Sequence, residues 1–214
     1  AKAVRYALDH QEFFDRKEIP LAEKLLARAG GLADVLAKGE SLYAGGKTDV
    51  RTSRVHAYVS RIDGSVQPYR IVIPPGFDPA QERPRRLDFW FHGRNEKLSE
   101  LNFIAQTSLG EFTPPDAFVV HLYGRYCNAS KFAGEIDLFE TLADVQRRYP
   151  IDEERIVIRG FSMGGAACWH FAVHYPGRFA AAAPGAGFAE TPQYLGVFKN
   201  GKAPPPWYEQ TLWR

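Results

Sequence analysis

The chain has 214 residues, which suits one large domain or one domain with an appendage. Apolar residues make up 45% of it, enough for a sizeable core. The net charge of +2 and the scattered arginines give no indication of nucleic-acid binding. No apolar run approaches the length of a membrane span.

The N-terminal part, residues 4–42, is predicted to be helical. Its apolar positions recur at roughly helical spacing: Leu21, Leu25, Leu26, Leu32, Val35 and Leu36. Pro20 and the pair Gly30 and Gly31 are expected to break this run into pieces. We therefore expect residues 1–45 to form a helical appendage packed on the main sheet. A linker beginning at Gly45 and Gly46 would join it to a core of residues 46–214.

An antiparallel hairpin is predicted to open the core. Residues 54–61 alternate as a strand does, Asp63 and Gly64 are typical of a tight turn, and residues 67–73 supply the partner strand. His56 falls on this hairpin and is expected to have no chemical role.

Further buried strands are predicted at residues 87–91, 117–122, 155–159 and 179–184. A crossover helix over 135–149 should end at Pro150, with Glu135 and Asp137 as favourable charges in its first turn. The predicted class is α/β: a mostly parallel sheet with helices on both faces. Loops after parallel strands surround the ligand crevice, so the loop at 123–128 is a candidate wall of a pocket, with a plain solvated loop as the alternative.

The most informative stretch is Gly-Phe-Ser-Met-Gly-Gly at residues 160–165. It follows a predicted strand and precedes a predicted helix at 166–173, which is the setting of a nucleophile elbow. Glycines beside the serine allow a tight turn and a close approach of helix and strand. Ser162 is therefore the candidate nucleophile. The amide of Met163, at the start of the helix, is a candidate donor to an oxyanion.

A second oxyanion donor is expected from the loop after the strand at 87–91. His92 and Gly93 follow that strand directly, so a sharp turn would aim the amide of Arg94 at the elbow. His92 as a metal ligand has little support, because no cluster with ligand spacing lies near it.

No cofactor and no metal are expected. Cys127 and Cys168 fit no zinc pattern, and Cys168, on the helix after the elbow, reads as a small buried residue. His170 and His174 have the spacing of a metal-binding face, but Phe171 stands where the zinc-protease motif has its glutamate.

A general base for Ser162 is harder to find. In this fold the order is serine, acid, histidine, yet only Glu190 and Glu209 follow Ser162 as carboxylates. His170 and His174 would lie roughly 12 and 18 Å along the helix axis from the serine. His92 belongs to the oxyanion loop, and His121 is inside a strand. We therefore hypothesise that the acid and the base lie beyond Arg214 or on another polypeptide.

The C-terminal segment supports that hypothesis, because it is too apolar to remain in water. Its large aromatic residues are Phe198, Trp207, Tyr208 and Trp213. We expect a second polypeptide or a further segment of chain to cover Trp207 and Trp213. The chain starts at Ala1 without Met, as a mature or trimmed form would. A secreted or periplasmic location is favoured over a cytoplasmic one.

Taken together, the motifs over residues 67–190 resemble the α/β-hydrolases. The resemblance is to their prolyl-oligopeptidase-like branch, near polyhydroxybutyrate depolymerases and feruloyl or acetyl-xylan esterases. The residues that carry it are His92 to Asn95, Tyr123 to Arg125, Gly134 and Glu135 with Asp137 and Glu140, Asp152 with Arg155, the elbow at 160–165, and Phe179 to Ala181. The resemblance implies Ser162 as nucleophile, with the amides of Met163 and Arg94 as oxyanion donors.

We therefore expect a serine hydrolase of small-molecule or polysaccharide esters that works through an acyl-enzyme. A peptidase of the same fold is one alternative. A non-catalytic binding protein that kept the elbow and lost the triad is the other. Arg94, Arg125 and Tyr126 are candidates to meet an acidic or sugar group of the substrate.

Overall fold

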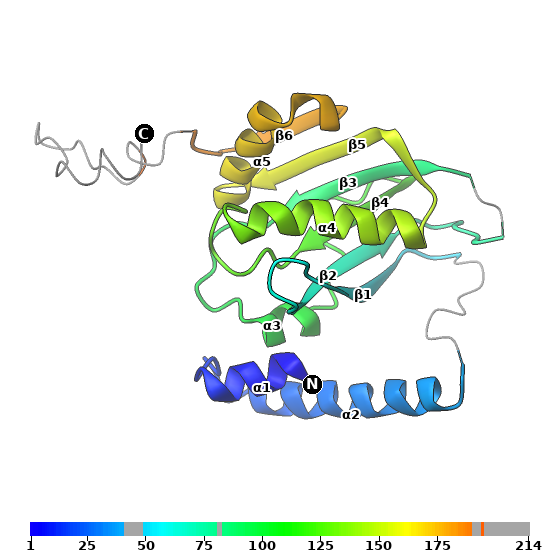
Figure 1. Ribbon diagram of the computed structural model, residues 1–214, viewed down its shortest axis with the longest axis vertical. Helices are drawn as coiled ribbons and strands as arrows, with labels where there is room; N and C mark the ends of the chain where they lie inside the picture. Colours follow the sequence, from blue (N-terminus) through cyan, green and yellow to red (C-terminus); the bar gives the residue numbers. More distant parts are fainter. Residues whose placement is uncertain (41–48, 81–82, 190–193, 195–214) are drawn as a thin grey trace, which may run out of the picture.

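A computed structural model describes residues 1–40, 49–80, 83–189 and 194. These residues build a six-stranded sheet in the order β1-β2-β4-β3-β5-β6 (Figure 1). The strands are β1 Thr52–Val59, β2 Val66–Ile73, β3 Arg85–Phe91, β4 Ala117–Leu122, β5 Ile151–Phe161 and β6 Ala181–Gly185. The helices are α1 Lys2–Asp9, α2 Glu18–Ala37, α3 Glu100–Ala105, α4 Ala133–Arg148 and α5 Met163–His174, with a short 3₁₀ helix, Pro176–Arg178.

The sheet is mixed in the predicted way. Strands β1 and β2 form an antiparallel hairpin, and β2 also runs antiparallel to β4. Strands β4, β3, β5 and β6 are mutually parallel. The carboxyl ends of these parallel strands, at Phe91, Leu122, Phe161 and Gly185, therefore meet at one edge, where the loops that follow them gather.

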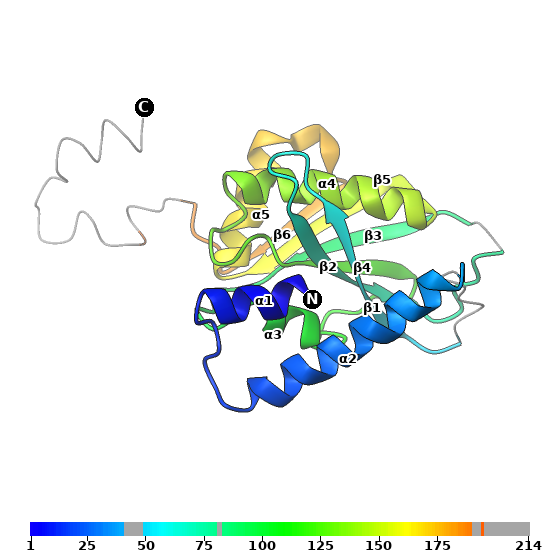
Figure 2. The same ribbon diagram turned by 60° about the horizontal axis from the view of Figure 1, so that its bottom comes forward.

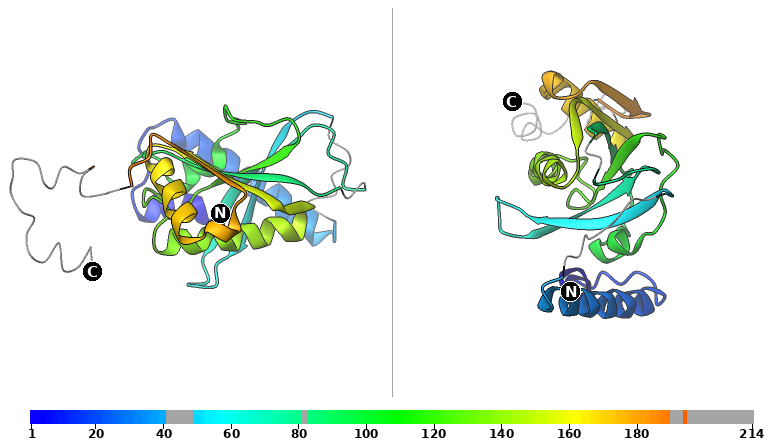
Figure 3. Two further views of the ribbon diagram at one scale, coloured as in Figure 1. Left: turned by 90° about the horizontal axis from the view of Figure 1, so that it is seen from above. Right: turned by 90° about the vertical axis from the view of Figure 1, so that its right-hand side faces the viewer.

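The main core lies between the sheet and helices α4 and α5, which cover the same face (Figures 1 and 3). Alternate residues of the strands face these helices, so Leu87, Phe89 and Phe91 of β3 all enter the core. Helix α4 contributes the buried side chains Leu138, Leu142 and Val145 at helical spacing. Helix α5 enters through Ala167, Cys168 and Phe171. This packing fixes the start of α5 against the end of β3.

The N-terminal helices form a separate layer, seen below the sheet in Figure 1. Helices α1 and α2 pack on α3, around Ala3, Val4, Ala7, Ala22 and Leu101. Figure 2 shows α2 running past the hairpin, and α2 and β1 jointly line a cavity of about 430 Å³. The expected appendage is thus attached to the sheet mainly through α3.

The predicted helix breaks in the N-terminal region are wrong. Pro20 lies in the first turn of α2, where its missing N–H leaves no helix hydrogen bond unmade. Gly30 and Gly31 lie inside α2 and do not interrupt it, because neighbouring helix formers offset their weak propensity. The break falls instead between Asp9 and Glu18.

Other boundaries differ by a few residues from those predicted. Strand β5 is extended at both ends, and β6 begins at Ala181 rather than Phe179. No helix of the described ranges has the length and hydropathy to cross a bilayer. The Gly45–Gly46 linker, Glu190, Glu209 and the aromatic residues Phe198, Trp207, Tyr208 and Trp213 fall outside the described residues.

Candidate active site

The candidate nucleophile, Ser162, lies in the turn between β5 and α5. Its backbone has φ 56° and ψ −119°, a left-handed region that residues with a side chain rarely adopt. Its N–H donates to the carbonyl of Gly185 at 2.9 Å, and its own carbonyl accepts from Ala166 N–H at 3.0 Å. Strain of this kind is concentrated at functional sites. Ser162 Oγ has no hydrogen-bond partner among the described residues.

Three glycines make this turn possible. A Cβ at Gly164 would overlap the carbonyl oxygen of Phe91 at the end of β3, and one at Gly160 would overlap the carbonyl of Gly164. A Cβ at Gly165 would lie 2.5 Å from the carbonyl oxygen of Gly185. Each clash is with backbone, so no side-chain movement would relieve it. The sequence signature of the elbow is therefore a packing requirement between α5 and its neighbouring strands.

The loop after β3, residues 92–99, lies against the elbow. A Cβ built on Gly93 would be 3.8 Å from Ser162 Cβ and 3.5 Å from the carbonyl oxygen of Phe161. Met163 is the first residue of α5, so its N–H has no acceptor within the helix. In the described part of the chain, the amide of Arg94 makes no backbone hydrogen bond either. The structure thus brings Ser162, Met163 and the Arg94 loop together.

A cleft of about 360 Å³ opens above Ser162, and we call it the serine cleft. Arg94 and Glu96 line one side, and the β4–α4 loop, residues 123–132, lines another. The prediction that this loop borders a pocket is confirmed, since Tyr126, Cys127 and Asn128 all face the cleft. Phe188 and Tyr194 complete its wall and stack on each other with centroids 4.1 Å apart.

Arg125 does not face the serine cleft, contrary to the expectation that it meets substrate. Its guanidinium turns the other way and bonds Asp137 of α4 at 2.9 Å, Asp63 of the β1–β2 turn at 2.6 Å and Ser60 Oγ at 2.9 Å. Hydrogen bonds from Arg125 lower the pKa of Asp63 below its ordinary range. Asp137 is almost completely buried, so this arginine supplies its counter-charge.

The β4–α4 loop needs such an anchor because its backbone is unusual. Arg125, Tyr126, Ala129, Ser130 and Phe132 all have positive φ. Non-glycine residues reach this region at a cost, so the surrounding contacts must hold the loop in place.

The same loop is bonded to the Arg94 loop. Asn95 N–H donates to Cys127 Sγ, and Cys127 Sγ donates to the Asn95 carbonyl, both at 3.3 Å. Tyr126 Oη donates to the carbonyl of Glu96 at 2.8 Å. The position of the second candidate oxyanion donor is therefore coupled to the β4–α4 loop and, through Arg125, to the hairpin turn.

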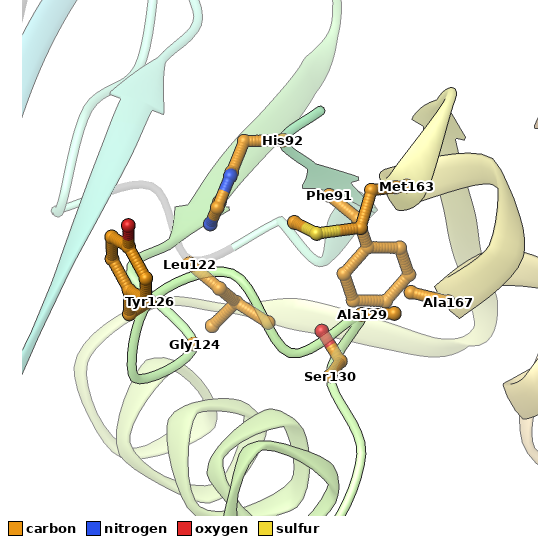
Figure 4. A pocket seen from close by; sticks show the side chains of 10 residues that line it. Phe91, His92, Leu122, Gly124, Tyr126, Ala129, Ser130, Met163 and Ala167 are labelled. Atoms are coloured by element: carbon orange, nitrogen blue, oxygen red, sulfur yellow. The ribbon is translucent and has the colours of Figure 1, made fainter. Parts of the chain in front are cut away.

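A small cavity, shown in Figure 4, borders the serine cleft and shares Tyr126, Ala129 and Met163 with it. It lies between Phe91 and His92 of the β3 end, Tyr126 and Ser130 of the β4–α4 loop, and Met163 of α5. Its volume of about 10 Å³ is close to the least that a single water molecule requires.

None of the histidines in the described part of the chain bonds Ser162. His92 contacts the carbonyls of Gly93 and Tyr123, at 2.8 and 3.1 Å. His170 bonds Glu135 at 2.5 Å, and His174 bonds the carbonyl of His170. Both were expected to be satisfied or exposed histidines, which these contacts confirm. A base that is hydrogen-bonded to Ser162 is thus not found among the described residues.

The remaining expectations concern cysteines and metals. Cys127 and Cys168 are both free thiols. Cys168 is buried as predicted, and burial raises the pKa of its thiol to about 11. Within the described ranges, no group of three or more metal-ligating side chains gathers. His56 is buried on β1 and bonds Tyr149 Oη at 2.8 Å, which agrees with a structural role.

The sequence did not predict that Cys127 lines the serine cleft or that the Arg125 side chain points away from it. A free cysteine five residues after a strand carries no signal of its position relative to a serine 35 residues later. The partners of Arg125 come from three separate segments, so only the folded chain reveals them.

Comparison with known proteins gives a structural answer alone. No family model matches the chain, and no curated protein matches it in sequence. Among solved structures, it is similar to a fluorophosphonate-binding serine hydrolase, FphF, from Staphylococcus aureus, with a TM-score of 0.56 and 18% identity over 72% of this chain and 62% of that one. It is also similar to the S-formylglutathione hydrolase FrmB from the same organism, with a TM-score of 0.53 and 20% identity over 75% and 65%.

A ferulic acid esterase gives a TM-score of 0.50 and 16% identity over 67% of this chain and 63% of that chain. The matched part thus spans less than two thirds of each of these three proteins. The described part of the chain has the α/β-hydrolase fold.

Proposed function

We propose that this protein is a serine hydrolase of carboxylic esters, with Ser162 as its nucleophile. The observation that carries the proposal is the strained conformation of Ser162 at the wall of the serine cleft. A serine with positive φ lowers the stability of the fold. Nothing in the packing requires a hydroxyl at this position. Its three neighbouring glycines allow this conformation and the close packing of α5 on β3.

The reaction follows from the arrangement. Ser162 Oγ attacks the ester carbonyl while a general base takes its proton, and the carbonyl oxygen becomes an oxyanion between the amides of Met163 and Arg94. Collapse expels the alcohol and leaves an acyl-enzyme, which water then hydrolyses to release the carboxylic acid. Each amide donor is expected to lower the barrier by about 3 kcal/mol.

The general base and its orienting acid are proposed to come from residues outside the described part. An imidazole would approach Ser162 Oγ through the serine cleft, which Ser162 lines. A further segment of the protein or a second polypeptide would bring it there.

The proposed substrates are small or carbohydrate-linked esters. One structural neighbour is named as a ferulic acid esterase. The aromatic side chains of Tyr126, Phe188 and Tyr194 in the cleft suit an aryl acyl group. An acetyl and a feruloyl ester with the same alcohol would separate a small acyl pocket from an aromatic one. A peptidase of the same fold is distinguished by turnover of the matching amide.

A non-catalytic binding protein is the second candidate, favoured by the absence of an imidazole at Ser162 in the described residues. A fluorophosphonate probe separates the two. A hydrolase becomes labelled on Ser162, and the label is lost in Ser162→Ala. A binding protein remains unlabelled although the cleft is open.

A further inference from the structure

A second cavity of about 390 Å³ lies beside the Arg94 loop and shares only Arg94 with the serine cleft. Arg70, Trp90 and His121 line it from the sheet. Leu98 and Phe103 add apolar surface, and Gly110 lies over the ring of His121, where a Cβ would come within 3.1 Å of Cε1.

The three sheet residues form one row. Arg70 of β2 pairs in register with His121 of β4, and His121 pairs in register with Trp90 of β3. Residues in register on neighbouring strands point to the same face. The core residues Phe89 and Phe91 flank Trp90 in sequence, so this row lies on the face opposite α4 and α5.

Arg70 is a buried cation without a carboxylate partner in the described part of the chain. Only 4% of the residue is exposed. Its Nη1 donates to the carbonyls of Ser108 at 2.7 Å and Gln106 at 3.4 Å. Its Nε is buried without an acceptor. A buried guanidinium is costly unless an anion compensates it, and two neutral carbonyls do so incompletely.

His121 adds a second polar group to the row. Its Nε2 is buried and has no hydrogen-bond partner among the described residues. Burial, and next the charge of Arg70, lower the pKa of His121 to about 3. The imidazole is therefore neutral at pH 7, and the site keeps a net positive charge from Arg70.

We propose that this cavity binds a small carboxylate with an aromatic or alkyl body. The carboxylate would pair with Arg70 through Nη2, because Nε is closed off by burial and Nη1 already donates to Ser108 and Gln106. The body would lie against Trp90, Leu98 and Phe103. The site is separate from Ser162, so it stands whether or not the protein is an esterase.

Isothermal titration with benzoate at pH 7 tests the proposal, with benzamide as the neutral analogue of the same shape. Benzoate is expected to bind at least roughly tenfold more tightly than benzamide, because only the anion compensates Arg70. Undetectable binding of benzoate, or equal affinity for the two compounds, would overturn the proposal.

Arg70→Met removes the charge and keeps much of the volume, and should weaken benzoate roughly tenfold or more. Arg155→Met is the matched control, because Arg155 is half-exposed and pairs with Asp152 at the surface. Circular dichroism checks that each variant is folded. A folded Arg70→Met protein that keeps the affinity of the original would refute the site.

A crystal soaked with 4-bromobenzoate keeps the test decisive if Arg70→Met does not fold. Anomalous bromine density is expected against Trp90 and Phe103, with the carboxylate turned toward Arg70. Bromine density confined to the serine cleft or to the surface contradicts the proposal, and so does a crystal without any.

Discussion

Gly164 lies against the carbonyl of Phe91, so that helix α5 and strand β3 meet backbone to backbone at this point. Any side chain at Gly164 must push the two apart. We predict that Gly164→Ala lowers the free energy of unfolding by about 3 kcal/mol or more, because overpacked backbone contacts cannot be relieved by rotamers. Urea unfolding monitored by circular dichroism measures the change.

Gly177→Ala is the matched control for this substitution. Nothing lies within 4 Å of the Cβ that it would add, and its φ is not in the left-handed region. We expect a change of at most about 0.5 kcal/mol. An equal loss in both variants would mean that α5 and β3 are not packed as described.

We predict that the protein is less stable with serine at position 162 than with glycine there. Ser162→Gly relieves the strain of the positive φ, whereas Ser162→Ala retains it. The free energy of unfolding of the glycine variant should therefore be about 1 kcal/mol larger than that of the alanine variant. Thermal and urea unfolding of the two variants give this difference. The reverse order would remove the argument that strain marks Ser162 as functional.

Arg125→Met is predicted to loosen the β4–α4 loop and with it the contact between Cys127 and Asn95. The reaction of Cys127 with a disulfide reagent at pH 8 should become faster, because its hydrogen bonds with Asn95 hold the thiol. Cys168 remains an internal reference, since it is fully buried.

Two further variants define the route of this effect. Asp63→Asn weakens the outer partner of Arg125 and should increase the rate less than Arg125→Met does. Arg155→Met should leave the rate of the Cys127 reaction unchanged, because Arg155 pairs with Asp152 and not with the β4–α4 loop. If Cys127 reacts with the reagent at an unaltered rate in the Arg125→Met variant, other contacts hold the loop.

Stability is predicted to decline in mild acid because of His56. Burial lowers the pKa of His56 from 6.5 to about 4. Above pH 6.5 neither the native nor the unfolded chain binds this proton. Between pH 6.5 and 4 the unfolded chain binds it and the native chain does not. The free energy of unfolding should therefore fall as the pH decreases, by up to about 1.4 kcal/mol per pH unit for this group.

His56→Gln should make that pH dependence shallower while keeping a polar group near Tyr149. Urea unfolding at a series of pH values from 7 to 4 compares the two proteins. His121, also buried with a lowered pKa, contributes in the same direction in both of them. Identical slopes would show that His56 is not buried in its neutral form.

The sequence was sufficient for the sheet and the elbow because their signals are local. Apolar runs give β3, β4 and β5, and the glycines around Ser162 are dictated by contacts within one strand-turn-helix unit and the strands beside it. The Arg94 loop was found for the same reason, since it directly follows a strand.

The rest depends on contacts between distant segments. The direction of Arg125 is set by Asp63 and Asp137, 62 and 12 residues away. The row of Arg70 and His121 exists only once β2 pairs with β4. In α2, Pro20 occupies the first turn, where a proline is tolerated, and Gly30 and Gly31 are carried by the helix formers around them, so neither breaks the helix.

The central claim is that Ser162 is a nucleophile, and peptide mass spectrometry after fluorophosphonate labelling tests it most directly. The account predicts one adduct, on the peptide that contains Ser162, together with loss of both adduct and ester turnover in a folded Ser162→Ala protein. Full ester turnover by that variant, or an adduct on another residue, would contradict it.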